Sequence, residues 1–334
     1  MLDSDKNTNK KRLPVLDLAK GLVILLVVLG HIVAKDVPQG NEWYFWLKAA
    51  LYKFHMPFFM FISGFVFYYN YKPVENFHDY AEIIKKKAMR LIPAYLIVGI
   101  FVLFSKMLAE NILYIDKPMV GGFAVNLLAI FIAPKLSVAT FLWYLYALMG
   151  VYLLFPLLHR LVNGNTSVLF LLGIIFYFLP INTDYFSLSD IFKFFVFAAA
   201  GALACDHYEK FTAIIYKFFW QLVIVFIVAL IASLLSPLIP KLITGLASIP
   251  VLLGLISRAK MGRLQKSLLF LGQNTLAIYL FNTICIGFVK ALLLKIAPWD
   301  GLNFLWFAPI LMISGVTIPL AIKHYIFPKA RWLR

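Results

Sequence analysis

The sequence predicts an all-α integral membrane protein, built as a bundle of about ten transmembrane helices. Of the 334 residues, 63% are hydrophobic and only 14% are charged, whereas a soluble domain carries about 25% charged residues. A chain of this composition could not cover a surface that faces water. Apolar runs of about 20 residues, each long enough to cross ~30 Å of hydrocarbon, recur along the chain. We therefore interpret residues 1–334 as a single transmembrane domain.

The apolar runs predict ten spans, and the charges between them predict their orientation. The spans are expected at 14–34, 54–71, 91–109, 140–158, 167–181, 190–204, 213–234, 238–257, 267–290 and 303–322. With the N-terminus inside, the inner segments hold 20 Lys and Arg residues and the outer segments hold 10. Because Lys and Arg collect in cytoplasmic loops, both termini are expected in the cytoplasm, as basic tails at 1–12 and 323–334. The net charge of +16 then reflects contact with anionic lipid, and we expect no nucleic acid partner.

The first span, LDLAKGLVILLVVLGH, holds three ionisable side chains in an apolar run. Lys20 and His31 are eleven residues apart, so they point to one side of a helix, ~16 Å apart along its axis. Asp17 lies about 40° off that line, and Gly21 and Gly30 allow a neighbouring helix or ligand to approach closely. Ionisable groups in a membrane are costly and usually functional, and a neutral histidine can act as a general base. The alternative is that Lys20 pairs with Asp17 and a backbone carbonyl satisfies His31.

The second span opens with YKFHMPFFMFISGFVFYY at 52–69. His55 lies at its outer end, at a depth comparable to that of His31, which favours a site shared by the two histidines. Read alone, His55 could equally cap the helix at the membrane interface. Ser63 lies mid-span, where its hydroxyl could donate to a developing oxyanion or simply pack between helices.

A dense cationic patch, KKKAMRLIPAY, follows on the inner side. Lys86 and Arg90 are four residues apart and share a helix face, and Lys87 lies three residues before Arg90. Such a patch suits phosphate groups. It could also be a topology signal that touches anionic lipid.

These three motifs, in this order and spacing, resemble the membrane acyltransferase 3 family, and among its branches the one similar to fucose 4-O-acetylases. Two later segments also resemble the family: TFLWYLYALMG at 140–150 matches its Trp-containing span, and LGQNTLAIYLFNT at 271–283 its late span. Such proteins are integral-membrane acyltransferases that typically move acetyl from acetyl-CoA onto sugars of surface polysaccharides. The resemblance therefore implies an acetyl-CoA-dependent O-acyltransferase that crosses the cell membrane several times.

The resemblance implies roles for residues of the first span and the basic loop. His31 matches the histidine presumed to be catalytic, and Asp17 would orient Lys20 or set the local charge. Lys20 stands where many members have Arg, and Lys87 with Arg90 matches an Arg-x-x-Arg motif that faces the cytoplasm. Together with Lys86, these cations would hold the phosphates of acetyl-CoA. Because Lys87 lacks a guanidinium fork, it cannot grip a phosphate with two parallel hydrogen bonds.

The acceptor site is expected on the outer side, close to His31. Candidates for contact with the acceptor are His55, Ser63, Trp143 and Asn282. The late span of the family often ends in a histidine where this chain has Asn282, so that position is given no role in proton transfer. The acceptor would be a cell-surface or lipid-linked glycan, and no metal or permanently bound cofactor is expected.

The resulting hypothesis is a protein-lined passage through which the pantetheine arm of acetyl-CoA reaches His31 from inside. His31 then deprotonates the sugar hydroxyl or carries the acetyl group transiently. From the residues alone, a proton-coupled transporter or a lipid-linked glycan flippase is an equally good reading of the intramembrane charges. Consumption of acetyl-CoA distinguishes the two classes.

Overall fold

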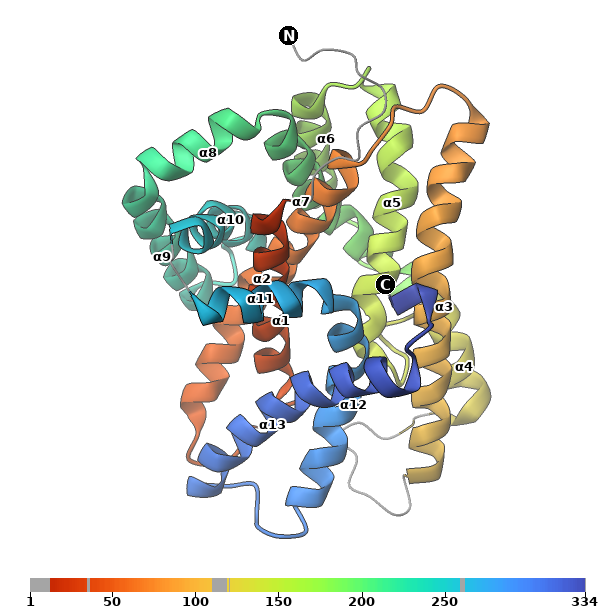
Figure 1. The fold of residues 1–334 in the computed structure, drawn as a ribbon, viewed down its shortest axis with the longest axis vertical. Coiled ribbons are helices and arrows are strands. Elements are labelled where there is room, and N and C mark those ends of the chain that lie inside the picture. The colour runs from red at the N-terminus through yellow and green to blue at the C-terminus, as the bar shows by residue number, and fades with distance from the viewer. Residues whose placement is uncertain (1–12, 35–36, 110–118, 120, 259–261, 334) are drawn as a thin grey trace.

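A computed structural model describes residues 13–34, 37–109, 119, 121–258 and 262–333, and within these ranges every regular element is a helix (Figure 1). The longer helices are α1 (Pro14–His31), α2 (Glu42–Tyr69), α3 (Phe77–Ala109), α4 (Gly122–Ile132), α5 (Trp143–Leu161), α6 (Thr166–Phe178), α7 (Leu188–Asp206), α8 (Tyr208–Lys217), α9 (Phe219–Leu235), α10 (Lys241–Arg258), α11 (Arg263–Gln273), α12 (Thr275–Leu293) and α13 (Leu302–Ala321). Short 3₁₀ or π turns cover Thr140–Leu142, Tyr185–Ser187, Ile322–Ile326 and Arg331–Leu333. The predicted all-α class is confirmed.

The number of spans is smaller than the ten predicted from sequence. Within the described residues, eight helices are long and apolar enough to cross a membrane, and a ninth span results if α8 and α9, which meet at 84°, count as one. The predicted span 167–181 forms α6, whose 13 residues reach only about 20 Å at 1.5 Å per residue. The predicted span 267–290 is broken at Asn274, where α11 ends and α12 begins. The basic segment 1–12 lies outside the described residues, and the cytoplasmic orientation of both ends stays a prediction.

The helix α1 occupies the middle of the bundle, in contact with α2, α10, α11, α12 and α13 (Figure 1). Its crossing with α11 depends on two glycines whose missing side chains let the backbones touch. A Cβ atom on Gly21 would lie 2.0 Å from the carbonyl oxygen of Leu268, and one on Gly272 would lie 1.8 Å from that of Asp17. The close approach expected at Gly21 is therefore confirmed. This crossing fixes the height of α1, and with it the position of His31 at its end.

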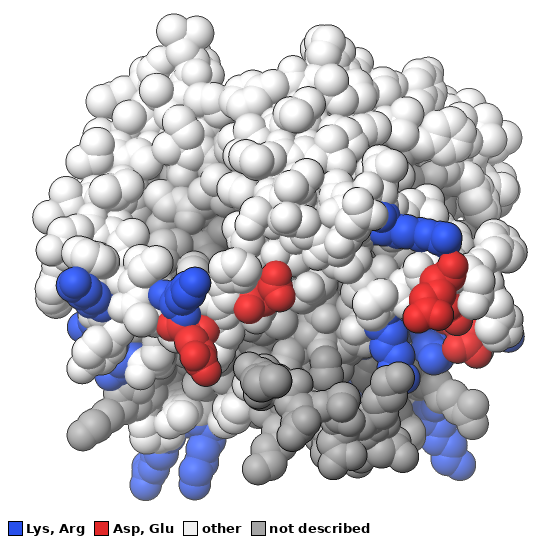
Figure 2. Space-filling view, turned by 90° about the horizontal axis from the view of Figure 1, so that it is seen from above, with Lys and Arg blue, Asp and Glu red and all other residues white. Residues whose placement is uncertain are grey.

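The surface of the bundle is what a lipid environment requires. Along α9, the apolar side chains of Trp220, Ile224, Val228 and Leu235 are all exposed. A contiguous apolar surface of this kind is rare on proteins that are surrounded by water. On the described part of the face shown in Figure 2, charged side chains gather at and below the middle of the view, and the upper part shows none. The chain is a multi-pass membrane protein.

Candidate active site

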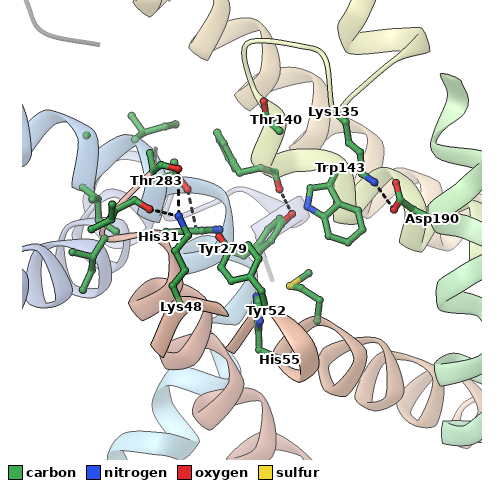
Figure 3. Close-up of a pocket in the computed structure, with 18 of the residues that line it drawn as sticks. His31, Lys48, Tyr52, His55, Lys135, Thr140, Trp143, Asp190, Tyr279 and Thr283 are labelled. Carbon is green, nitrogen blue, oxygen red and sulfur yellow. Dashed lines mark hydrogen bonds and ion pairs between the residues drawn. The ribbon is translucent and has the colours of Figure 1, made fainter. Parts of the chain in front are cut away.

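A cavity of about 1300 Å³ lies at one end of the bundle. Its walls come mainly from the last residues of α1 and α3, from α12 beyond Tyr279, from the first halves of α2, α7 and α10 and from the segment before α5, with Ile318 and Ile322 at the end of α13. In the predicted orientation, most of these segments lie on the outer side, whereas the end of α13 lies toward the inner side. Among the predicted site residues, His31, His55 and Trp143 line this cavity (Figure 3).

His31, the last residue of α1, is held by two neighbours on α12. Its Nδ1 lies 2.8 Å from Oδ1 of Asn282 and 3.2 Å from the hydroxyl of Thr283. The amide of Asn282 can adopt only one orientation, because its Nδ2 donates to the carbonyls of Ile278 at 2.9 Å and Tyr279 at 2.7 Å. Oδ1 must then accept, so Nδ1 of neutral His31 carries the proton. The lone pair is left on Nε2 of a ring that lines the cavity.

This arrangement differs from two expectations, the carbonyl partner of His31 and the acceptor contact of Asn282. A side-chain amide satisfies the imidazole, whereas the alternative to a catalytic role invoked a backbone carbonyl. Asn282 is fully buried and is absent from the described lining of the cavity. It therefore touches the histidine, and the direct contact with the acceptor expected from sequence is not part of this geometry.

His55 and its neighbour Tyr52, both on α2, line another part of the cavity. Nδ1 of His55 donates to the carbonyl of Leu51 at 2.5 Å, so its Nε2 also has a free lone pair. The ring packs edge-on against Tyr52, with 5.0 Å between ring centroids. Tyr52 in turn donates to the carbonyl of Gly30 at 3.3 Å, which ties α2 to the turn that carries His31. The two histidines thus share one cavity, as their similar depth predicted.

Trp143 and Tyr279 form the next part of the wall. In the view of Figure 3, Tyr279 lies between His31 and Trp143. The ammonium of Lys135 lies 5.3 Å from the ring centroid of Trp143 and 2.6 Å from Oδ1 of Asp190. The indole is therefore held beside an ion pair, with an aromatic face available to a bound molecule.

Ser63 lies deeper in the bundle, away from the described cavity lining. Its hydroxyl hydrogen-bonds that of Tyr144 at 3.0 Å. The ring of Tyr144 stacks on Phe59 at 5.1 Å between centroids, and lies 5.8 Å from that of Tyr279. These three rings form an aromatic layer (Phe59, Tyr144 and Tyr279) under the cavity, and Ser63 packs against it.

The predicted phosphate-binding cations are gathered at the opposite end of the bundle. Lys20 donates to Asp17 at 3.0 Å, so the predicted ion pair is present. Lys87 lies over the rings of Phe67 and Tyr152, 5.0 and 5.1 Å from their centroids. It is also close enough to Arg90 for the two charges to interact.

Lys86 differs from its neighbours. Its ammonium lies 3.7 Å from Glu82, and the side chain is 77% exposed. The helix turns it away from the surface that Lys87 shares with Phe67 and Tyr152.

None of the four cations Lys20, Lys86, Lys87 and Arg90 is among the described residues that line the cavity. The aromatic layer reaches the cavity through Tyr279, which lines it and packs against Tyr144 and Phe59. The open passage from these cations to His31 stays a prediction.

Several residues of these two sites escaped the sequence analysis. Lys323, counted there only as part of a basic tail, donates to Asn274 at 2.7 Å and interacts electrostatically with Arg90. Thr283 follows Asn282 directly but carried no pattern of its own. The sequence showed the lysines around the cavity only as basic residues in outer segments, where few are expected, and it did not show that they meet.

Comparisons with known proteins find two partial relatives. The chain is 45% identical over 53 residues to nodulation protein NolL of Mesorhizobium japonicum, and equally to nodulation protein NolL of Sinorhizobium fredii. Each match covers 15% of this chain and 14% of the relative, so the chain matches only a small part of either protein. No solved structure gave a significant match.

The family comparison covers nearly the whole chain. The profile described as "Acyltransferase domain" matches residues 13–324. That range includes α1 with His31, the basic end of α3 and the α12 segment that holds the imidazole. The chain therefore belongs to the acyltransferase 3 family, and this membership implies acyltransferase activity.

Proposed function

We propose that the protein is a membrane O-acetyltransferase, which moves an acetyl group from cytoplasmic acetyl-CoA to a hydroxyl of a cell-surface or lipid-linked glycan. The observation that supports this most directly is the fixed tautomer of His31. Oδ1 of Asn282 accepts a hydrogen bond from the N–H at Nδ1, so Nε2 is left as a basic nitrogen for the cavity. An imidazole in this state can take a proton from a hydroxyl or attack a thioester.

In the direct route, Nε2 of His31 removes the proton of the acceptor hydroxyl as its oxygen attacks the thioester carbonyl. The new ester C–O bond forms, the C–S bond breaks, and the CoA thiolate takes the proton from the imidazolium. The hydrogen bond from Nδ1 to Asn282 strengthens while the ring is positively charged, because hydrogen bonds from ionised donors are stronger than neutral ones.

In the two-step route, Nε2 attacks the thioester carbonyl, the N–C bond forms and the C–S bond breaks, and the CoA thiolate takes a proton from water and leaves as the thiol. The sugar hydroxyl then attacks the acetyl-imidazolium, its proton goes to the hydroxide left by that water, and the N–C bond breaks to release the neutral imidazole. Both routes need the same tautomer. They differ in whether acetyl remains on the protein when no acceptor is present.

The donor would enter from the end that carries Lys20, Lys87 and Arg90. Lys87 and Arg90 are close enough for their charges to interact, which suits the phosphates of CoA, and Arg90 can hold a phosphate with two parallel hydrogen bonds. The proposed route from there to His31 passes the aromatic layer, whose rings must then separate. The proposal thus includes a movement of Tyr144 and Tyr279 on donor binding.

The test is His31→Ala, assayed in membranes with labelled acetyl-CoA and isolated surface glycan. Because general-base catalysis contributes roughly 10²- to 10⁴-fold, we expect transfer to fall by at least the lower figure. The matched control is His78→Ala, an exposed histidine on α3 whose nearest charged neighbour is Glu82 at 3.8 Å. Retention of transfer by His31→Ala would remove this residue from the reaction. A transporter would leave acetyl-CoA intact in the wild-type protein, so the release of free CoA thiol distinguishes that class.

A further inference from the structure

The cavity that contains His31 has an unusual charge. Its described lining includes one carboxylate, that of Asp190, and the following lysines: Lys48, Lys53, Lys106, Lys135, Lys193, Lys241 and Lys290. In the predicted orientation, this end of the protein faces away from the cytoplasm. Basic residues are less common on that side of a membrane protein than on the cytoplasmic side. In the sequence these lysines are seven of the ten basic residues counted in the outer segments, and no function was assigned to them.

Four of these lysines form a cluster around Asp190: Lys53, Lys135, Lys193 and Lys241. Lys135 binds Asp190 at 2.6 Å. Lys241 is near enough to the other three lysines and to Asp190 to interact electrostatically with each. Asp190 also interacts with Lys193 and with a second carboxylate, Asp184, so the four lysines and two carboxylates carry an excess of two positive charges.

The cluster is assembled by the tertiary structure. Its members come from α2, the segment before α5, α7 and α10. Lys53 donates to the backbone carbonyl of Ser233, which fixes its ammonium in the wall. The ammonium groups of Lys193 and Lys241 make no hydrogen bond or ion pair with any residue that the structure describes, and both side chains line the cavity. Like charges held together this way repel one another, and a bound oxyanion would relieve that repulsion.

We propose that the glycan acceptor is anionic, with a phosphate or carboxylate group that the lysine cluster binds while a hydroxyl of the same molecule reaches His31. This inference rests on the proposed acetyl transfer and specifies its acceptor. Phosphates and carboxylates both accept several charge-assisted hydrogen bonds, so the cluster suits either. In Figure 3, Lys135 and Asp190 lie on the far side of Trp143 from His31. The indole and Tyr279 then separate the anionic group from the reacting hydroxyl, and offer aromatic faces to the sugar between them.

The experiment compares three acceptors with one neutral glycan backbone: unmodified, phosphorylated, and with a uronic acid in place of one sugar. For the wild-type protein, we expect kcat/KM to be at least about tenfold higher for one or both anionic forms, a difference equivalent to one good ionic contact. The advantage should shrink as NaCl rises from about 50 mM to about 500 mM, since salt screens exposed charges. Comparison of the phosphate and uronate forms identifies which group the cluster recognises.

The decisive variant is Lys193→Gln/Lys241→Gln. We expect its KM for the preferred anionic acceptor to rise about tenfold or more, with the KM for acetyl-CoA and the transfer to the neutral acceptor unchanged. Lys193→Arg/Lys241→Arg retains the charges and should retain the preference. The matched control is Lys210→Gln/Lys217→Gln, two lysines of α8 that do not line the cavity.

The outcomes separate this inference from the proposed function. Equal use of the neutral and anionic acceptors by the wild-type protein overturns the inference and leaves acetyl transfer standing. A raised KM for acetyl-CoA in the Gln variant, with the acceptor KM unchanged, also overturns it, since the lysines would then bind the donor. If the Gln variant does not fold, competition of wild-type transfer by inorganic pyrophosphate or glucuronate decides: inhibition competitive with the acceptor supports the inference, and no inhibition contradicts it. Absence of CoA release with every acceptor refutes the proposed function itself.

Discussion

Replacement of Asn282 by leucine tests whether the imidazole of His31 works through its fixed tautomer. The wild-type contact is a 2.8 Å hydrogen bond from Nδ1 to Oδ1. In the transition state the imidazole is positively charged, and a hydrogen bond to a charged group contributes about 1.5–3 kcal/mol. Since about 1.4 kcal/mol corresponds to a tenfold change in rate, Asn282→Leu should lower kcat roughly 10- to 150-fold.

The effect should fall on kcat and leave both KM values nearly unchanged, because Asn282 is buried and outside the described cavity lining. The assay is initial acetyl transfer in detergent-purified protein, with acetyl-CoA and acceptor varied separately. Two matched variants sharpen it. Thr283→Val removes the 3.2 Å contacts of its hydroxyl with Nδ1 of His31 and Oδ1 of Asn282 but leaves the shorter bond from Nδ1 to Asn282, so it should cost about tenfold or less. Asn282→Asp retains an acceptor oxygen and should be more active than Asn282→Leu.

Loss of folding is a separate outcome and can be measured. The amide of Asn282 donates to two carbonyls of its own helix, and helix carbonyls one turn earlier already accept backbone hydrogen bonds. Leucine should therefore change the thermal unfolding temperature only slightly. An Asn282→Leu protein that unfolds like the wild type and keeps kcat within about threefold would refute the argument that Asn282 positions the imidazole.

Two further predictions concern the donor end and the helix crossing. Arg90→Ala should raise the KM for acetyl-CoA about 10- to 100-fold without altering the acceptor KM, because a charge-assisted contact to phosphate is lost. The control is Lys210→Ala, at an exposed lysine on α8. An equal rise in both KM values would contradict a role of Arg90 in donor binding. Gly272→Ala should destabilise the fold by about 1–3 kcal/mol, because its Cβ would meet the carbonyl oxygen of Asp17 at 1.8 Å. Gly287→Ala has no heavy atom within 4 Å of the new Cβ, so it should unfold at or above the wild-type temperature in the same thermal scan; similar behaviour of both glycine variants would refute the tight crossing.

The membrane class, most of the spans and the main ionisable residues follow from the sequence alone, since they depend on local composition and helical period. An apolar run of suitable length predicts a helix wherever it packs. The Asp17–Lys20 pair was predictable for the same reason: residues three apart meet on any helix. Likewise, the similar depth of His31 and His55 follows from their distances to the ends of two neighbouring spans.

Contacts between distant segments were decided only when the helices packed. His31 and Asn282 are 251 residues apart, and no periodicity in the sequence links them. Their pairing depends on how α12 packs against α1. The break at Asn274 was hidden because α11 and α12 read as one apolar run, yet α11 turns aside to cross α1 at Gly21 and Gly272. The lysine cluster around Asp190 is formed by four separate segments. Each segment contributes one lysine, and one lysine by itself does not indicate an anion-binding site. Composition and period are properties of a short stretch of chain, whereas a site is a property of which stretches meet.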